Sequence, residues 1–367
     1  GKTGNDRIAP YQYLSSYGFS STPYVFDEDV EVKTLSELRI ANPNVTWEEA
    51  EQSNIGVDGQ LLNGRFSFSF DYFHNLRTKI LWFRNASVPV STGLTLPAEN
   101  IGEVVNRGFE FQIGYNDRAG DFSYAFSVNG SAAHNKIKFW DETPGVPEYQ
   151  QSTGRPMNAG LYYNAIGIFK DQAAIDAYPH WAGARPGDII FEDVNDDKQI
   201  NGLDRVRAKK TDIPTFTGGF SIELGYKNFY ASAFLQGASG AVRNYSIESG
   251  KIGNFLAESA EGRWTVDNPN ASKPRTWNGS GEYWSSTSVN NTYWLVNNDY
   301  LRLKNIQVGY NLPFALTEKL GLNHFSVYFN GLNLVTFTQS KSFDPETVGN
   351  NYPLNKVYNL GFRVSFK

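Results

Sequence analysis

One stretch decides the fold, and it reads YNLGFRVSF at residues 358–366. Aromatic or aliphatic side chains take every second position, while Asn359, Gly361, Arg363 and Ser365 take the positions between them. Because successive side chains of a β-strand point to opposite faces, this stretch is predicted to be a strand with one apolar face. The pattern recurs along the chain. It favours an all-β fold, an antiparallel transmembrane β-barrel that closes on this strand.

Four predicted hairpins carry the same alternation. The clearest has Asn63-Gly64 at its turn, a pair that suits a type I′ turn because both central residues need positive φ. Its strands are residues 55–61 and 66–72. The other hairpins pair 109–115 with 122–128, 220–226 with 229–235, and 306–310 with 325–329. With the final strand, the sequence predicts about nine strands.

The connections between the predicted strands fall into two groups. Those within hairpins are mostly short, whereas four between hairpins are long, at about 84–101, 141–212, 240–297 and 339–355. Short turns at one end and long loops at the other are typical of outer-membrane barrels. Residues 1–367 are therefore interpreted as barrel sequence with long extracellular loops.

The alternative is a soluble antiparallel sheet that packs one face on a core. Two features argue against it. The positions opposite the apolar face are Ser, Gly, Asn and Gln more than the Lys, Glu and Thr of a solvated sheet. The apolar face also stays uncharged over eight or nine residues, longer than sandwich strands of about five or six. A barrel requires this, because an Arg or Lys facing lipid at mid-depth costs about 2–4 kcal/mol.

Composition narrows the class of protein further. Aromatic residues make up 15% of the chain, and no run of about 18 apolar residues could form a transmembrane helix. Tyr72, Tyr115, Tyr226 and Tyr310 lie near predicted strand ends, where amphipathic rings suit the membrane interface. The simple preference of tyrosine for strands is the alternative reason.

Charge and cysteine content exclude other classes. The net charge of -5 argues against nucleic acid as a partner. The absence of cysteine excludes disulfides and Cys-based zinc sites. The chain opens on Gly-Lys-Thr-Gly without an initiator Met or a signal-type segment. Either a signal peptide has been removed or the chain is a downstream piece of a longer polypeptide, and we expect the second.

An acidic segment at residues 193–204 has the ligand spacing of a calcium loop. Lys198 replaces the glycine usual at position 6, and an Asp rather than a Glu stands at position 12. A solvated Asp/Asn-rich loop is therefore the alternative. A bound Ca²⁺ would be structural, holding the 141–212 loop together, and no organic cofactor is predicted. The candidate ligands are Asp193, Asn195, Asp197, Gln199 and Asp204.

Aromatic residues gather in the predicted loop 240–297. Exposed flat rings suit stacking on sugars or gripping peptide side chains. Packing of the loop on itself or on a partner is the alternative, and the sequence leaves both open. The candidate substrate-binding residues are Trp264, Trp277, Trp284, Trp294, Tyr283 and Tyr293.

No catalytic constellation is found. The sequence contains no Gly-x-Ser-x-Gly, no His-Glu-x-x-His and no phosphate-cradling glycine loop, and its four histidines are scattered. We therefore predict no catalytic residues and no enzyme. The polar positions expected to line the lumen are Asp71, Glu110, Gln112, Glu223, Gln236 and Arg363.

Ordered motifs extend over most of the chain. They are NPNVTWE at 42–48 with NIGVD at 54–58, NIGEVVNRGFE at 100–110, PGDI at 186–189 with DVN at 193–195, DYLRLKNI at 299–306, and GLNL at 331–334 with FDPE at 343–346. This series resembles SusC/RagA-type TonB-dependent outer-membrane transporters of Gram-negative cells.

The resemblance implies a 22-stranded barrel with an internal plug, of which this chain would supply the C-terminal part. The plug and further barrel strands would come from an N-terminal portion, which would also contact the TonB complex. The barrel would lie in a lipid bilayer with a SusD-like lipoprotein over its loops. The implied function is nutrient import, with oligosaccharide as the first candidate cargo and peptide as the second. A passive porin and an outer-membrane or glycan-active hydrolase are the alternatives.

Overall fold

A ten-stranded antiparallel sheet dominates the computed structural model, which describes residues 1–3, 11, 13–19, 21–26, 30–84, 96–245, 256–277, 282–285, 288–340, 342–347 and 352–366. The strand order within these residues is β1-β6-β7-β8-β9-β14-β15-β18-β19-β20. The strands of this sheet are therefore adjacent in the order in which they occur along the chain. The strands are β1 (Lys2–Thr3), β6 (Glu48–Leu61), β7 (Phe66–Phe83), β8 (Ala98–Ala119), β9 (Phe122–Phe139), β14 (Phe216–Tyr226), β15 (Phe229–Ser239), β18 (Tyr300–Asn311), β19 (Leu322–Thr338) and β20 (Val357–Phe366).

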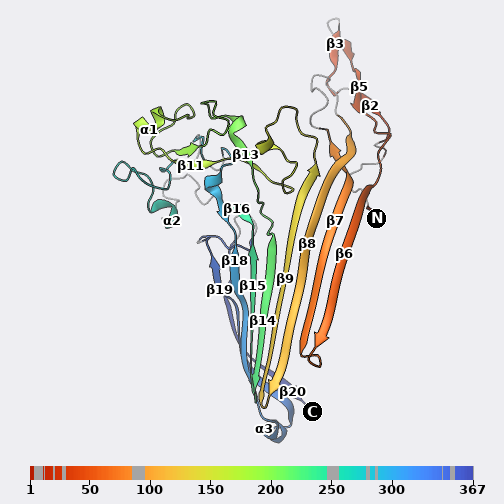
Figure 1. The fold of residues 1–367 in the computed structure, drawn as a ribbon, viewed down its shortest axis with the longest axis vertical. Helices are drawn as coiled ribbons and strands as arrows, with labels where there is room; N and C mark the ends of the chain where they lie inside the picture. Colours follow the sequence, from red (N-terminus) through yellow and green to blue (C-terminus); the bar gives the residue numbers. More distant parts are fainter. Residues whose placement is uncertain are drawn as a thin grey trace. The chain divides into compact units, whose positions relative to one another are not determined.

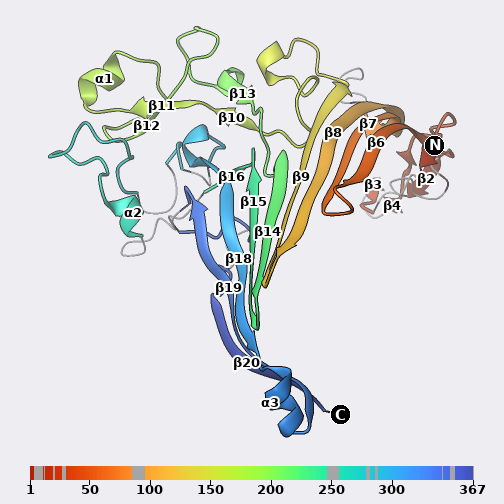
Figure 2. The ribbon, with the colours of Figure 1, turned by 60° about the horizontal axis from the view of Figure 1, so that its bottom comes forward.

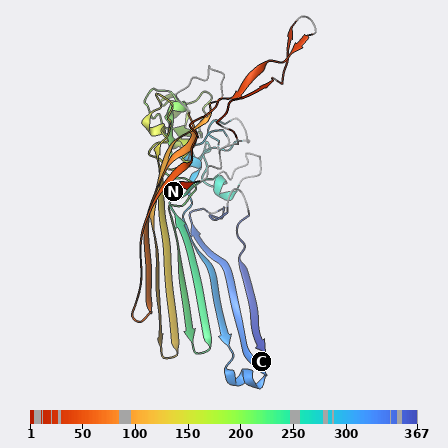
Figure 3. The same ribbon diagram turned by 90° about the vertical axis from the view of Figure 1, so that its right-hand side faces the viewer.

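All nine predicted strands are confirmed, and several are longer than predicted. The alternation in 109–115 belongs to a strand of 22 residues, β8, for example. The predicted long loops fall on the connections 84–97, 140–215, 240–299 and 339–356. Figure 3 shows β14, β15, β18 and β19 side by side, with their short turns at one end.

The turn of the first hairpin lies one residue earlier than predicted. Leu62 and Asn63 have φ of 54° and 57°, so they are its central residues. The amide of Gly64 donates to the carbonyl of Leu61 at 3.1 Å, which closes the turn. Glycine follows at φ 85°, a conformation that costs it little. Leucine at positive φ is uncommon, and the Asn-Gly pattern could not reveal it.

Shorter elements occupy the N-terminal region and the connections (Figure 1). Helix α3 (Phe314–Lys319) joins β18 to β19, as Figure 2 shows. No helix among the described residues is long and apolar enough to cross a membrane. The remaining strands and α-helices among the described residues are β2 (Ser16–Phe19), β3 (Tyr24–Phe26), β4 (Val30–Val32), β5 (Leu35–Arg39), β10 (Leu161–Tyr163), β11 (Ala165–Ile168), α1 (Gln172–Asp176), β12 (Ile189–Phe191), β13 (Arg205–Arg207), β16 (Val242–Asn244), α2 (Ala257–Ala260) and β17 (Leu295–Asn297).

The chain divides into two compact units. Unit 1 comprises residues 1–54, 73–107 and 134–157. Unit 2 comprises residues 55–72, 108–133 and 158–367. Unit 2 contains β14 to β20 and the long connections between them, and the sites described below lie within it.

Strand register in unit 2 sorts the side chains onto two faces. One face carries a cross-strand row beside the short turns, which we call the aromatic row. Five of its six side chains are aromatic, the composition expected where a barrel meets the membrane interface. Its members, from β9 to β20, are Phe122, Tyr226, Phe229, Tyr310, Val327 and Phe362.

The apolar face is open rather than packed. Phe229 is 57% exposed and Val308 45% exposed, although both lie inside the sheet and not on its edge. The buried apolar side chains of the long strands are small or aliphatic, such as Ala132 and Ala238. A soluble sandwich would cover such a face with a second layer, because burying a large apolar side chain contributes about 1.5–3 kcal/mol. The described residues supply no such layer, which fits a lipid-facing surface.

Candidate functional site

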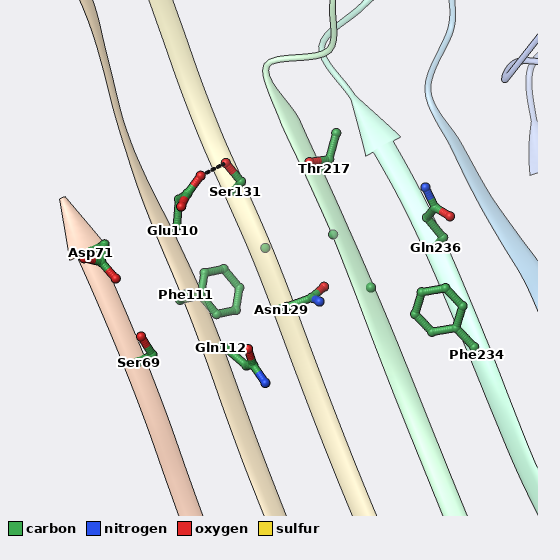
Figure 4. Close-up of a pocket in the computed structure, with 13 residues that line it drawn as sticks. Ser69, Asp71, Glu110, Phe111, Gln112, Asn129, Ser131, Thr217, Phe234 and Gln236 are labelled. Atoms are coloured by element: carbon green, nitrogen blue, oxygen red, sulfur yellow. Dashed lines mark hydrogen bonds between the residues drawn. The ribbon is translucent and has the colours of Figure 1, made fainter. Parts of the chain in front are cut away.

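The polar face of unit 2 contains a recess of about 530 Å³. Strands β7, β8, β9, β14 and β15 form it, with hydroxyl, amide and carboxylate groups (Figure 4). No Lys or Arg occurs among the described residues that line it. The lining residues are Ser69, Asp71, Glu110, Phe111, Gln112, Asn129, Gly130, Ser131, Thr217, Gly218, Gly219, Phe234 and Gln236.

Short strand-to-strand contacts set the geometry of the recess. The Ser131 hydroxyl donates to Oε1 of Glu110 at 3.2 Å, as Figure 4 shows. The Asp71 carboxylate lies over the backbone of Gly56, where any Cβ would collide with it. Two carboxylates therefore lie on the wall of the recess, and the described residues that line it include no Lys or Arg side chain to pair with them. The arrangement suits hydrogen-bonding solutes that are neutral or basic.

Four of the six predicted lumen residues meet in this recess: Asp71, Glu110, Gln112 and Gln236. Glu223 lies in a second recess of about 690 Å³, nearer the short turns. Arg363 is on the same face, opposite Ser326. Strand parity therefore placed these side chains on one wall.

The tryptophans form a buried core within the loops of unit 2. Trp277, Trp284 and Trp294 are between 0% and 6% exposed. They pack with apolar residues of the 158–212 segment, which include Tyr163, Ile189, Phe191 and Ile200. The prediction that these three rings are exposed for substrate is therefore wrong. Apolar packing outweighs exposure, and the arrangement observed is packing of the 240–297 loop against the 158–212 segment.

The other members of the predicted aromatic site surround this core. Tyr283 and Tyr293 are partly buried against it. The Tyr283 hydroxyl donates to the carbonyl of Ile189 at 3.0 Å, and burial raises the pKa of that hydroxyl. Trp264 is half-buried, and its indole N–H donates to the carbonyl of Lys170 at 3.1 Å. These contacts tie loop to loop, and substrate binding by Trp264, Tyr283 and Tyr293 stays a prediction.

Asp188 is the polar centre of the loop core. It is 0% exposed, and its Oδ1 accepts from Nε of Arg275 at 2.7 Å and from Nε1 of Trp284 at 2.8 Å. Oδ2 accepts from the amide of Arg185 at 2.9 Å. Burial raises the pKa of this carboxyl even though the hydrogen bonds and Arg275 oppose that shift. Each oxygen is paired, as a buried carboxylate requires.

The predicted calcium loop is closed by its own backbone. Asp193 Oδ2 accepts from the amide of Lys198 at 2.9 Å, and Asp197 Oδ1 accepts from that of Gln199 at 2.8 Å. Asp204 is 0% exposed and accepts from the amides of residues 194 and 201. The described residues include no group of three or more acidic or histidine side chains placed to hold a metal. Calcium at Asp193, Asn195, Asp197, Gln199 and Asp204 stays a prediction.

An ion-pair network clamps the last long connection to β18. Arg302 is 1% exposed, and its Nη2 lies 2.7 Å from Oδ1 of Asp344. Lys304 Nζ lies 2.9 Å from Oε1 of Glu346, which also pairs with Arg302. We call residues 342–347 and these two basic partners the clamp. Burial would raise the pKa of Asp344, but hydrogen bonds from Arg302 and from two backbone amides outweigh it and lower that pKa.

Comparison with known proteins places the chain. A family model described as "TonB dependent receptor-like, beta-barrel" matches residues 10–334. The chain belongs to the TonB-dependent receptor-like β-barrel family. The predicted resemblance to SusC/RagA-type members is also confirmed, by the relatives that follow.

Curated relatives in this family are longer than the chain. It is 28% identical to TonB-dependent receptor P3 of Formosa agariphila over 400 residues, covering 100% of this chain and 38% of that receptor. It is 25% identical to TonB-dependent receptor SusC of Bacteroides thetaiotaomicron, covering 99% of this chain and 35% of SusC. The chain thus spans well under half the length of these receptors.

A solved structure shares the fold. The structure of the RagAB peptide importer in its open-open state matches with a TM-score of 0.72 at 23% identity. The match covers 100% of this chain and 39% of that chain. At this identity the likeness shows the fold alone.

Two features were missed from the sequence. Both halves of the clamp lie in motifs that carried the resemblance, DYLRLKNI and FDPE, yet nothing in the sequence joined them. They are 42 residues apart, from Arg302 to Asp344. Phe234 on the polar face could have been found, because it alternates in phase with Ser232 and Gln236.

Proposed function

We propose that this chain forms part of the barrel of an outer-membrane importer that takes up a nutrient with energy delivered through TonB. The observation that carries the proposal is that the sheet has one apolar and one polar face, in a chain that belongs to the TonB-dependent receptor-like β-barrel family. The open apolar face suits lipid, and the polar face suits a wet passage. Import would proceed by binding and gated passage, without breaking a bond.

Cargo and partner belong to the same proposal. We infer oligosaccharide as the first candidate cargo and peptide as the second, with a SusD-like lipoprotein over the long loops. The SusC relative supports such a partner through the SusC/RagA resemblance, and the RagAB structure is named as a peptide importer. The polar recess supports either cargo through its amides, hydroxyls and carboxylates.

Uptake by cells that carry the full-length protein tests the proposal. Fluorescent maltohexaose, laminarihexaose and a tryptic casein digest serve as probes, with and without TonB. We expect uptake of at least one probe to require both this protein and TonB. Uptake that continues unchanged without TonB would contradict active import and favour the passive porin. Cleavage of a probe by the purified protein would favour the alternative function of a hydrolase.

A further inference from the structure

Phe234, Tyr230 and Tyr328 are aromatic side chains on the polar face of unit 2. Register places Phe234 opposite Ser221 and Asn305, and Tyr230 opposite Gly225 and Gly309. Tyr328 of β19 lies on the same face, between Gly309 of β18 and Gly361 of β20. All three rings are half-buried. An apolar ring on a polar wall is the exception there, so each one needs a reason.

Each ring lies over a glycine of a neighbouring strand. A Cβ at Gly309 would come closer than 3.0 Å to the ring of Tyr230. The same holds for Gly361 under Tyr328 and for Gly219 under Phe234. Figure 4 shows the Phe234 ring leaning from β15 towards β14. Because glycine has no side chain, the ring can lie flat along the sheet and turn one face to the lumen side.

Polar groups surround these rings, and most of them are amides and hydroxyls that both donate and accept hydrogen bonds. Phe234 shares its recess with Asn129 and Gln236, and Tyr230 shares the second recess with Ser232 and Glu223. Beside Tyr328, the amides of Asn305, Asn330 and Asn359 join in a chain. Asn330 Nδ2 lies 3.2 Å from Asn305 Oδ1, and Asn359 Nδ2 lies 3.5 Å from Asn330 Oδ1.

This combination matches the surface of a pyranose. A sugar ring has an apolar C–H face that packs on a flat aromatic ring, and its edge carries hydroxyls that both donate and accept. A peptide main chain would gain less from flat rings. At the recess of Phe234 an anionic sugar would be repelled by Asp71 and Glu110. The recess of Tyr230 is lined by two basic and two acidic side chains, so it has no formal net charge that would attract one: Arg65, Arg118, Asp117 and Glu223. We propose that Phe234, Tyr230 and Tyr328 are contact stations for the rings of a neutral oligosaccharide. The inference rests on the proposed import function and names its cargo.

Substitution of the rings in the full-length protein tests this. Phe234→Leu and the double variant Tyr230→Leu with Tyr328→Leu remove the flat faces, while Phe234→Trp keeps one. Phe329→Leu is the matched control, since Phe329 follows Tyr328 in β19 but points to the apolar face. The probes are maltohexaose, laminarihexaose and the casein digest. Thermal unfolding of each purified variant is measured in parallel.

We expect the half-saturation concentration for an oligosaccharide to rise about fivefold for each ring lost. Phe234→Trp and Phe329→Leu should leave it unchanged, as should the peptide probe in every variant. Equal loss of both kinds of probe with a lower unfolding temperature would overturn the stations, because the rings would then serve the sheet or contact protein inside the lumen. Wild-type uptake of neither oligosaccharide would overturn them too. If uptake requires TonB but is unchanged in the ring variants, the contact stations are refuted and the import function is not. If uptake does not require TonB, the import function is refuted.

Discussion

Aromatic residues occupy two regions of this molecule in opposite ways. On the sheet, Tyr226 and Phe229 stand open to the surroundings, in strands that alternate with a period of two. In the loops, Trp284 is 0% exposed and sits in a core that has no period. A soluble domain would show the reverse, with its strands around the core and polar loops outside. The difference teaches that the apolar surface of the sheet is kept for lipid, while the loops fold on their own core.

The loop core should be the more sensitive region to loss of a ring. Trp284→Ala is expected to cost about 3–5 kcal/mol, because it leaves a cavity and removes a hydrogen bond to buried Asp188. Phe229→Ala, at an open position, should change stability much less in detergent. Limited proteolysis of the loops at 158–215 and 240–297 in each variant measures the difference. Equal resistance to protease in the two variants would break the comparison.

A charge should discriminate between the two faces of one strand. Val308→Arg places a cation on the apolar face, two residues from Tyr310 of the aromatic row. We therefore expect a cost of about 1–2 kcal/mol, between the values for the interface and for mid-depth in a bilayer. Gln307→Arg is the matched control, since residue 307 lies on the polar face. The folded fraction in the outer membrane, read from heat-modifiable migration on gels, compares them. If both variants assemble alike, the faces are not distinguished by lipid.

Calcium would sharpen the account of the loops. If Asp193, Asn195 and Asp197 bind Ca²⁺, free calcium at ten times its Kd should stabilise the loop region by about 1.4 kcal/mol. Protease resistance of this region with calcium or with a chelator measures the effect, and Asp197→Ala should abolish it. Resistance that is the same under both conditions would argue for the solvated loop.

Acid should loosen the clamp before it affects the sheet. Because the pKa of Asp344 is lowered in the folded protein, its contribution is present above its ordinary value of 3.8 and is lost as pH falls through the folded pKa. The protection of the backbone amides in residues 342–347, measured by comparing the observed hydrogen-exchange rate with the intrinsic rate at the same pH, should therefore fall below about pH 4. Asp344→Asn should remove this dependence. Protection that does not change with pH in the wild type would refute the role of Asp344.

The sequence could predict what local periodicity controls. Alternation in segments such as 220–226 and 229–235 located the strands, and parity assigned Asp71, Glu110 and Gln236 to one wall. Arrangements that depend on contacts between residues far apart in the sequence could not be predicted from it. The Trp284–Asp188 contact joins residues 96 apart, so nothing local could tell a buried ring from an exposed one.

The central claim is that the two faces of the sheet meet lipid and water respectively. Residues 1–367 contain no cysteine, so a cysteine introduced there is the single thiol in this part of the protein. Single cysteines at residues 220–226 of β14, spin-labelled in the full-length protein in bilayers, report accessibility to lipid-soluble oxygen and to a water-soluble nickel complex. We predict an alternation with period two, in which positions 220, 222 and 224 favour oxygen and positions 221 and 223 favour nickel. The reverse phase, or no alternation, would contradict the account.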